Sequence, residues 1–419
     1  MKTSHPNPNS SPGGMALPKL TEGGREARQE LAEFYRSYLL ENVVPFWLPR
    51  SLDREHGGYF TCLNRDGALL QEDKSVWFQG RMAWMFATLA LTVEKRPEWV
   101  EAARSGVEFL ERHGFDQDGR MFYSLTREGR PLRKRRYLFS ECFTVIAYAA
   151  FGALSGEEHW IRRAESVLEL VVRYRDTPGL LEPKTNPETR PAKGLSLTMI
   201  LLVTAQELRK YSDHPICVRL IDEALAEIAG NFVCPEFRCV LEMTGSNGEF
   251  LDNLDGRCVN PGHSLEVGWF ILEEARQRGN DPELVKLGTQ IIDWSLELGW
   301  DGEHGGILYF RDAKGLPCTE YWHDMKFWWP HNEAVLAALY AYEATGERRY
   351  AEWHDRIAQW AFDHFADAEH GEWYGYLHRD GSVSTPVKGT MYKGFFHLPR
   401  MLWAGWRLLD SSGEPGCHP

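Results

Sequence analysis

The sequence predicts an all-α fold: an (α/α)6 barrel of twelve helices in six pairs, with short β-hairpins between the pairs at one rim. Two observations lead to this prediction. A turn-rich segment interrupts helical sequence six times, with anchors at residues 53, 116, 176, 235, 301 and 367. In addition, alternate helices between these anchors are unusually apolar. A nearly fixed period means that one supersecondary unit is repeated.

The repeated turns share an acidic residue that is followed by glycine and aromatic residues. The clearest copies span residues 52–60, 115–123, 300–306 and 365–374, with weaker equivalents near Asp176 and Pro235. Aromatic and β-branched residues then alternate around turns such as Asn64-Arg65-Asp66-Gly67, which predicts short hairpins. Because His56, His304 and His370 recur in Glu-His-Gly turns, we expect them to have a structural role.

Each interval between anchors is long enough for two ordinary helices and a hairpin. Several predicted helices begin with proline or an acidic residue, which the unpaired N–H groups and the dipole of a first turn favour. The predicted helices span 24–47, 74–95, 97–113, 137–155, 157–175, 191–211, 213–232, 261–278, 281–299, 326–345, 347–365 and 392–410.

The even-numbered helices should form the inner ring of the barrel. Residues 143–154 carry no charge, and residues 195–203 are nearly as apolar, so both segments should be buried on most sides. The odd-numbered helices carry more charge and should lie outside. An open solenoid would need distinct polar caps at both ends, and the sequence shows none.

Composition is typical of one large globular domain. We expect a flexible N-terminal tail over residues 1–23, a single catalytic domain over 24–411 and a short C-terminal tail over 412–419. The first segment lacks the apolar stretch of a signal peptide, and no apolar run approaches 18 residues, so we expect no membrane span. The eight cysteines are scattered and should be reduced thiols. These features together favour a cytoplasmic location.

Several functions are disfavoured by charge and by missing motifs. The net charge of −13 argues against a nucleic-acid partner, whose phosphates need a basic face. Cys234 and Cys239 could form half of a zinc site, but no second pair completes it, so we expect no metal. The sequence contains no GxxxxGK[ST], GxGxxG, HExxH or GxSxG motif, which leaves the common phosphate, dinucleotide, zincin and hydrolase sites without support.

Four predicted inner helices place charged or titratable side chains on one face near their first turns. The four sets are Trp77, Arg81 and Trp84; His263 and Glu266; Lys326, Trp329 and Glu333; and Lys393, His397 and Arg400. Tryptophan alone would suggest core packing. Inward-facing charges are costly to bury unless they surround a pocket, so we expect one here. His331 falls off the shared face and should only border it.

Aromatic platforms beside charged groups suit a polyhydroxylated ligand, and a sugar is the natural candidate. Two histidines on opposite helices could transfer protons at either face of one carbon. Glycoside hydrolysis would instead require two carboxyl groups that flank the scissile bond, and Glu266 and Glu333 are available for that. The residues alone leave both chemistries open.

The chain resembles the N-acylglucosamine 2-epimerase family from about residue 28 to 408. The matching pieces are Pro45-Phe46-Trp47, residues 56–63, Trp77-Phe78-Gln79-Gly80-Arg81, Thr189-Arg190-Pro191, Asn260-Pro261-Gly262-His263-Ser264-Leu265-Glu266, and residues 326–333, 371–376 and 393–400. The resemblance implies an (α/α)6 barrel with His263 and His397 as the catalytic pair. It also implies that the substrate site contains Arg81, Glu266, Glu333, Trp329, Lys184, Arg190 and Arg400.

The same resemblance implies a homodimer that needs no cofactor, with ATP as a possible allosteric effector. Residues 393–400 are more similar to the N-acetylglucosamine branch than to the cellobiose branch, whereas Phe78 and Pro330 depart from that pattern. We therefore expect interconversion of N-acetyl-D-glucosamine and N-acetyl-D-mannosamine. The alternatives are an epimerase or aldose–ketose isomerase acting on mannose, glucose or cellobiose, a glycoside hydrolase, and a non-catalytic binding protein.

The expected chemistry is removal of the C2 proton after the sugar ring opens. His263 lies in a first helical turn, whose positive dipole end should favour the neutral imidazole that a base requires. Glu333 has two possible roles. It could bind substrate or aid ring opening, or it could only balance the charge of Arg81 or Lys326.

Overall fold

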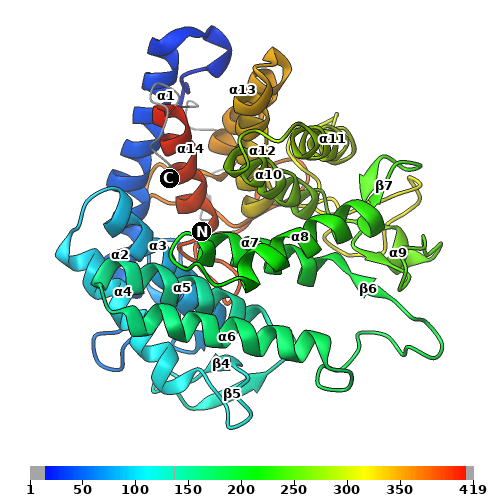
Figure 1. Ribbon diagram of the computed structural model, residues 1–419. Helices are drawn as coiled ribbons and strands as arrows, with labels where there is room; N and C mark the ends of the chain where they lie inside the picture. The colour runs from blue at the N-terminus through cyan, green and yellow to red at the C-terminus, as the bar shows by residue number, and fades with distance from the viewer. Residues whose placement is uncertain (1–14, 136, 412–419) are drawn as a thin grey trace, which may run out of the picture.

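The structure is a computed structural model that describes residues 15–135 and 137–411, and its helices confirm the predicted barrel. Figure 1 shows the helical pairs following one another around the molecule, with α14 beside α1. The outer helices are α1 (Gly24–Tyr38), which continues through Leu39–Val43 into α2 (Val44–Ser51), α4 (Pro97–His113), α6 (Glu158–Asp176), α8 (Ile216–Glu227), α11 (Pro282–Gly299) and α13 (Arg348–Phe365). The inner helices are α3 (Val76–Thr92), α5 (Phe139–Ser155), α7 (Leu195–Arg209), α10 (Pro261–Gln277), α12 (Trp328–Thr345) and α14 (His397–Ser411).

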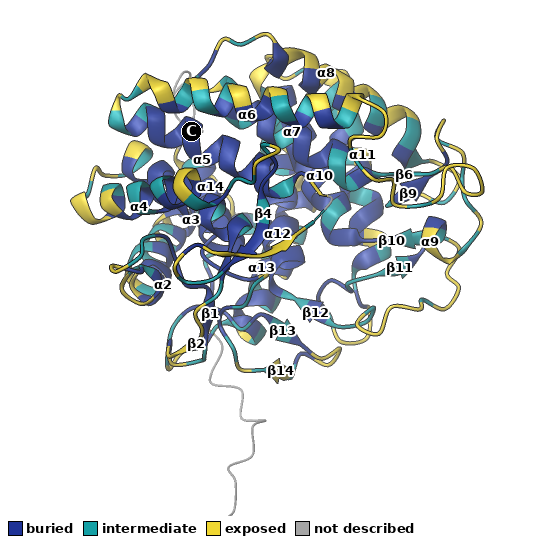
Figure 2. Cartoon of the chain, turned by 90° about the horizontal axis from the view of Figure 1, so that it is seen from below, coloured by how far each residue is buried: buried dark blue, intermediate teal, exposed yellow. Residues whose placement is uncertain are grey.

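Burial separates the two rings as the apolar pattern predicted. Every residue of α12 from Trp328 to Ala341 is buried, whereas α13 buries only one face. Figure 2 shows the same contrast between the inner helices and the striped outer helices. Close packing of the inner ring depends on small residues: a side chain at Gly80 of α3 would lie 2.6 Å from the Phe143 carbonyl of α5.

The last inner helix closes the ring against the first. Phe86 of α3 stacks on Phe395 with ring centroids 4.7 Å apart, and Trp84 packs edge-on against Trp403 of α14. Within the described ranges, no helix is both long and apolar enough to cross a lipid bilayer.

Small antiparallel sheets lie at the rim where the outer helices lead into the inner ones. The pairings are β1 (Cys62–Leu63) with β2 (Leu69–Gln71), β3 (Lys74–Ser75) with β4 (Phe122–Leu125) and β5 (Pro131–Lys134), β6 (Lys193–Gly194) with β9 (Met243–Thr244), β7 (Val233–Cys234) with β8 (Cys239–Val240), β10 (Cys258–Val259) with β11 (Arg311–Asp312), and β12 (Lys326–Phe327) with β13 (Tyr376–Leu377) and β14 (Val383–Thr385). Four of these strands, β3, β6, β10 and β12, directly precede inner helices. Each pairs with a strand from a later hairpin, which fixes where that helix begins.

Three of the repeated turns are built around a buried aspartate. Each carboxylate accepts backbone N–H groups of its own turn and binds one buried lysine and one hairpin arginine. The sets are Asp53 with Lys74 and Arg127, Asp301 with Lys326 and Arg379, and Asp367 with Lys388 and Arg65. The pair of Asp367 and Arg65 joins the last turn to the first hairpin and so helps to close the barrel. The backbone N–H groups of the turn histidines His56, His304 and His370 donate to these carboxylates, so all three residues belong to the framework of the turns.

We expect Asp367→Asn to lower the free energy of unfolding by about 3 kcal/mol, because Lys388 would keep a buried charge without its partner. Hydrogen bonds and cations hold the pKa of Asp367 below its usual range, although burial opposes them. Its contribution should therefore be complete above the ordinary aspartate pKa and decline as the pH falls through the lowered value. Denaturant unfolding at several pH values measures both effects. Glu369→Gln is the control because that carboxylate pairs with Arg65 while exposed, and it should cost less than about 1 kcal/mol.

The N-terminal boundary differs in detail from the expected tail over residues 1–23. Leu17 and Leu20 are buried, and Thr21 donates a hydrogen bond to Asp355 of α13 over 2.6 Å. Residues 15–23 therefore pack on the barrel before α1 begins. Residues 1–14 and the expected C-terminal tail over 412–419 lie outside the described part of the chain.

Candidate active site

A cavity of about 780 Å3 lies inside the ring of inner helices. It brings together most of the residues that the sequence singled out, since the first turns of the inner helices converge there. The predicted site residues that line it are Arg81, His263, Glu266, Trp329, His397 and Arg400. Trp77, Trp84 and Phe143 add aromatic walls, so the cavity combines ring faces with a few charges.

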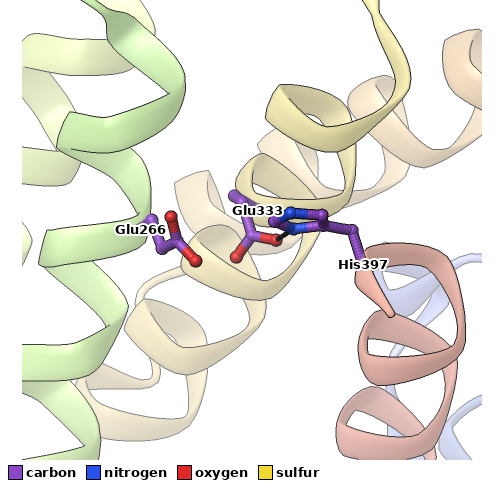
Figure 3. Close-up of side chains that lie close together, drawn as sticks. All are labelled: Glu266, Glu333 and His397. Atoms are coloured by element: carbon purple, nitrogen blue, oxygen red, sulfur yellow. Dashed lines mark hydrogen bonds and ion pairs between the residues drawn. The ribbon is translucent and has the colours of Figure 1, made fainter. Parts of the chain in front are cut away.

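Glu333 joins His397 and Arg400 in one buried cluster. Its Oε1 accepts from the Nδ1–H of His397 over 2.7 Å and forms an ion pair with Arg400 Nη2 at 2.7 Å. The other oxygen accepts from the indole N–H of Trp269 over 2.9 Å. Arg400 Nη2 also lies 2.7 Å from Glu266 Oε1. Figure 3 shows Glu266, Glu333 and His397 pointing toward one another from α10, α12 and α14.

The geometry of this cluster could also suit a metal, because one ligand atom from each of Glu266, Glu333 and His397 lies within 4.8 Å of the others. Arg400 already occupies the space between the two carboxylates and balances their charge. Its guanidinium packs 5.1 Å from the Trp269 ring centroid and 4.8 Å from that of Phe396, which holds it in place. We therefore interpret the cluster as an ion-pair network that orients His397.

His263 is held by a different carboxylate. Its Nδ1 lies 3.0 Å and 3.1 Å from the two side-chain oxygens of Glu242, which precedes β9. Asn260 caps α10 by accepting the His263 backbone N–H over 3.1 Å. Trp329 contacts both catalytic candidates, with its ring centroid 5.0 Å from His263 and 5.8 Å from His397. Both histidines thus use Nδ1 for a carboxylate and leave Nε2 for other partners.

The pKa values of the two histidines are shifted in opposite directions, and the direction for His263 differs from the one that the helix dipole predicted. Burial lowers the pKa of His263, but Glu242, Glu266 and Glu333 together outweigh burial, so the pKa is raised. Burial and the cations of Arg81 and Arg400 lower the pKa of His397 well below its ordinary value. Near neutral pH, His263 is the better proton donor and His397 the better base. The dipole argument failed because a direct carboxylate contact outweighs one helix end.

Among the described residues that line the cavity, Arg81 is the cation without a carboxylate within ion-pair distance. Its guanidinium lies 4.1 Å and 4.7 Å from the ring centroids of Phe143 and Phe396. Its Nε has no hydrogen-bond partner among the described residues, and burial lowers its pKa to about 9. Because a buried, unpaired guanidinium is costly, this side chain is suited to meet a negative charge that appears during a reaction.

Two predicted site residues lie elsewhere. Lys184 lines a separate cavity of about 750 Å3 beside α7 and α8. Arg190 is exposed, and its closest ion-pair partner is Asp255 at 3.9 Å. Both come from the segment between α6 and β6, which the helical pattern could not place.

The sequence predicted that Lys326 and Lys393 share the inward face of the inner helices, but neither lines the cavity. Both lie before the first residue of their helix, since α12 begins at Trp328 and α14 at His397. Lys326 binds Asp301, and Lys393 binds Glu372 over 2.7 Å. His331 is fully buried, donating from Nδ1 to the Phe327 carbonyl and accepting the Ile307 N–H. It is a structural residue rather than one that borders the pocket.

The sequence also missed Glu242, Tyr309 and Tyr376. Glu242 lies in a short connection, 21 residues before its partner His263, so no helical spacing could reveal it. The tyrosines line the cavity from hairpin segments that have no fixed spacing to the inner helices. Only the pairing of the strands brings these residues to the site.

Comparisons with known proteins agree with this geometry. The sequence profile of the family described as N-acylglucosamine 2-epimerase (GlcNAc 2-epimerase) matches residues 58–399. The chain is 39% identical over 384 residues to N-acylglucosamine 2-epimerase of Bos taurus, covering 89% of this chain and 90% of the relative. It is 36% identical to the Homo sapiens protein of that name, covering 87% and 86%.

The fold is also found among solved structures. Cellobiose 2-epimerase from Spirochaeta thermophila superimposes with a TM-score of 0.79 at 21% identity, covering 93% of this chain and 99% of that structure. At such low identity the likeness concerns the fold alone. The profile match and the identity to the mammalian proteins show that the chain belongs to the N-acylglucosamine 2-epimerase family.

Proposed function

We propose that this protein is a cofactor-independent sugar 2-epimerase that interconverts N-acetyl-D-glucosamine and N-acetyl-D-mannosamine. The observation that carries the proposal is the pair of histidines on either side of Trp329, which share one cavity with Arg81 and have pKa values shifted in opposite directions. The identity to N-acylglucosamine 2-epimerases supports the choice of substrate.

The reaction begins from the open-chain aldehyde, because the C2 proton becomes acidic only beside a carbonyl group. Neutral His397 removes this proton from one epimer through Nε2, while its Nδ1–H stays bound to Glu333. Protonated His263 then returns a proton to the opposite face of C2. The other epimer reacts in the reverse sense, with the two histidines exchanging roles.

Arg81 stabilises the intermediate of this reaction. Removal of the C2 proton moves negative charge onto the O1 oxygen and gives an enolate. A cation that is already held in place, with its Nε removed from solvent, stabilises such a charge more strongly than water does. Since no carboxylate lies within ion-pair distance of Arg81 in the described parts of the chain, its charge remains available for the intermediate.

The carboxylate geometry favours epimerisation over glycoside cleavage. A hydrolase needs one carboxyl group as acid and another as base or nucleophile, separated across the scissile bond. Here Glu266 and Glu333 both pair with a single Arg400 nitrogen, which lies 2.7 Å from an oxygen of each carboxylate. Neither group is arranged to act as a free acid.

An activity assay in deuterium oxide tests the proposal. We expect N-acetylmannosamine and N-acetylglucosamine to interconvert with deuterium incorporated at C2 of the product. With mannose or glucose as the substrate, label at C1 of a ketose would instead show aldose–ketose isomerisation. Binding of the acetamido sugars without turnover would show a binding protein. Glucose, mannose and cellobiose serve as competing substrates. Faster turnover of any of these would assign the site to another branch.

Three further features complete the proposal: the first two are inferred from the family resemblance, and the third from the composition of the chain. The chain forms a homodimer, responds to ATP as an allosteric effector and acts in the cytoplasm. Light scattering of the purified protein tests the first feature, and turnover measured with and without ATP tests the second. Imaging of a tagged chain in its native cell tests the third.

A further inference from the structure

We infer that Glu242 is the positioning residue of His263: its carboxylate orients the imidazole and stabilises the protonated ring between turnovers. The inference rests on the proposed two-histidine reaction. It explains how two histidines of one site begin the reaction in opposite roles, His263 as the acid and His397 as the base.

The contact is made by both oxygens of the Glu242 carboxylate. They lie 3.0 Å and 3.1 Å from His263 Nδ1, which fixes the proton on that nitrogen and leaves Nε2 for substrate. The Glu242 backbone is itself fixed, because its carbonyl accepts the N–H of Leu195 at the start of α7 over 3.1 Å. The side chains are 29% exposed for His263 and 19% for Glu242, so the pair is only partly screened by water.

The surroundings of the two carboxylates explain the unlike histidines. Glu333 shares its charge between His397 and Arg400. Glu242 has no lysine or arginine within ion-pair distance in the described ranges, so its whole charge acts on His263. The other charged groups that face His263 are Glu266 of its own helix, Glu333 of α12 and the His397 ring of α14.

This arrangement makes a prediction about pH. In the active enzyme one histidine of the pair is protonated to the imidazolium form and the other is neutral, whichever epimer is bound. Activity should therefore fall in acid as His397 gains a proton and fall in alkali as His263 loses its own. Because Glu242 raises the pKa of His263, it extends the alkaline side of the profile to higher pH. Both epimers should show the same pH dependence of kcat/KM, since their ratio is fixed by the equilibrium constant.

Glu242→Gln tests the inference, because the amide keeps the shape and a hydrogen-bond acceptor but removes the charge. We expect the alkaline side of the kcat/KM profile to move down by about one pH unit, and kcat/KM at high pH to fall about tenfold for both sugars. Glu242→Asp keeps the charge and should retain most of the alkaline activity. Glu249→Gln is the matched control in the adjacent loop, where the exposed carboxylate binds only local groups of that loop, chiefly Asn247, and it should leave the profile unchanged.

Titration of the His263 ring by NMR gives a readout that does not need turnover. The resonance is assigned by its loss in His263→Ala, and its pKa should be lower in Glu242→Gln than in the unchanged protein. An unchanged His263 titration in Glu242→Gln overturns the inference, as does an equal shift in Glu249→Gln. If the unchanged protein converts neither acetamido sugar, the proposed function fails, while the NMR titration still decides the role of Glu242.

Discussion

His263→Ala and His397→Ala should each lower kcat by about a hundredfold to ten-thousandfold, because each removes one of the two proton-transfer groups. The remaining histidine should still act on the face of C2 that it contacts. Each variant should therefore exchange the C2 proton of one epimer with deuterium oxide without converting that epimer to the other. The two variants should act on opposite epimers. NMR of the sugar, recorded during incubation, measures exchange and conversion together.

His159→Ala provides the control for this experiment. That histidine lies exposed on α6 against Trp160 and should leave both exchange and conversion unchanged. Circular dichroism and thermal melting establish that the active-site variants remain folded. If either variant converts the sugars at a substantial rate, that histidine must be removed from the catalytic pair.

Glu333→Gln should lower turnover by well over tenfold and also lower the free energy of unfolding by about 3 kcal/mol. An amide cannot accept at both positions, so it loses either the His397 and Arg400 contact or the Trp269 contact. The sequence left Glu333 as either a substrate group or a counter-ion. The position of Glu333 predicts a loss of both turnover and stability, because its Oε1 binds His397, the proposed base, and also pairs with Arg400. Turnover per folded molecule and denaturant unfolding separate the two effects.

Glu274→Gln is the matched control. Glu274 is also a fully buried carboxylate of the inner ring, but it binds Gln206, Arg209 and Arg278 away from the histidines. This variant should melt earlier with normal turnover per folded molecule. If Glu333→Gln behaves in the same way, Glu333 is a counter-ion without a role in the reaction.

Acid and alkaline pH should also act on different parts of the molecule. The aspartates of the repeated turns lose their stabilising charge only in strong acid, whereas His263, whose pKa is raised above its ordinary value, loses its proton as the pH rises. Activity should therefore fall on the alkaline side while the barrel remains folded.

The repeat and the apolar pattern were sufficient to predict the barrel. Twelve helices with a fixed spacing of turns can bury their apolar faces efficiently only by stacking in order. Alternate helices such as α5 and α7 have few enough charged residues to be placed in the inner ring. Side chains such as His263, Glu266 and His397 could be placed because the first turns of inner helices converge at one rim. Two predicted helices began too early in the sequence, so the side chains of Lys326 and Lys393 were wrongly assigned to the face that lines the cavity.

Other features depended on contacts between distant segments. Glu242 reaches His263 only because β6 and β9 pair and place the preceding residue beside α10. The opposite pKa shifts of the two histidines follow from their neighbours: burial, Arg81 and Arg400 lower the pKa of His397. Glu242, which has no lysine or arginine within ion-pair distance in the described ranges, raises that of His263. The sequence by itself determined the ring of helices and which ends of them meet. The tertiary structure decided which charges touch, because electrostatic energies depend on distances of a few ångströms that no helical period encodes.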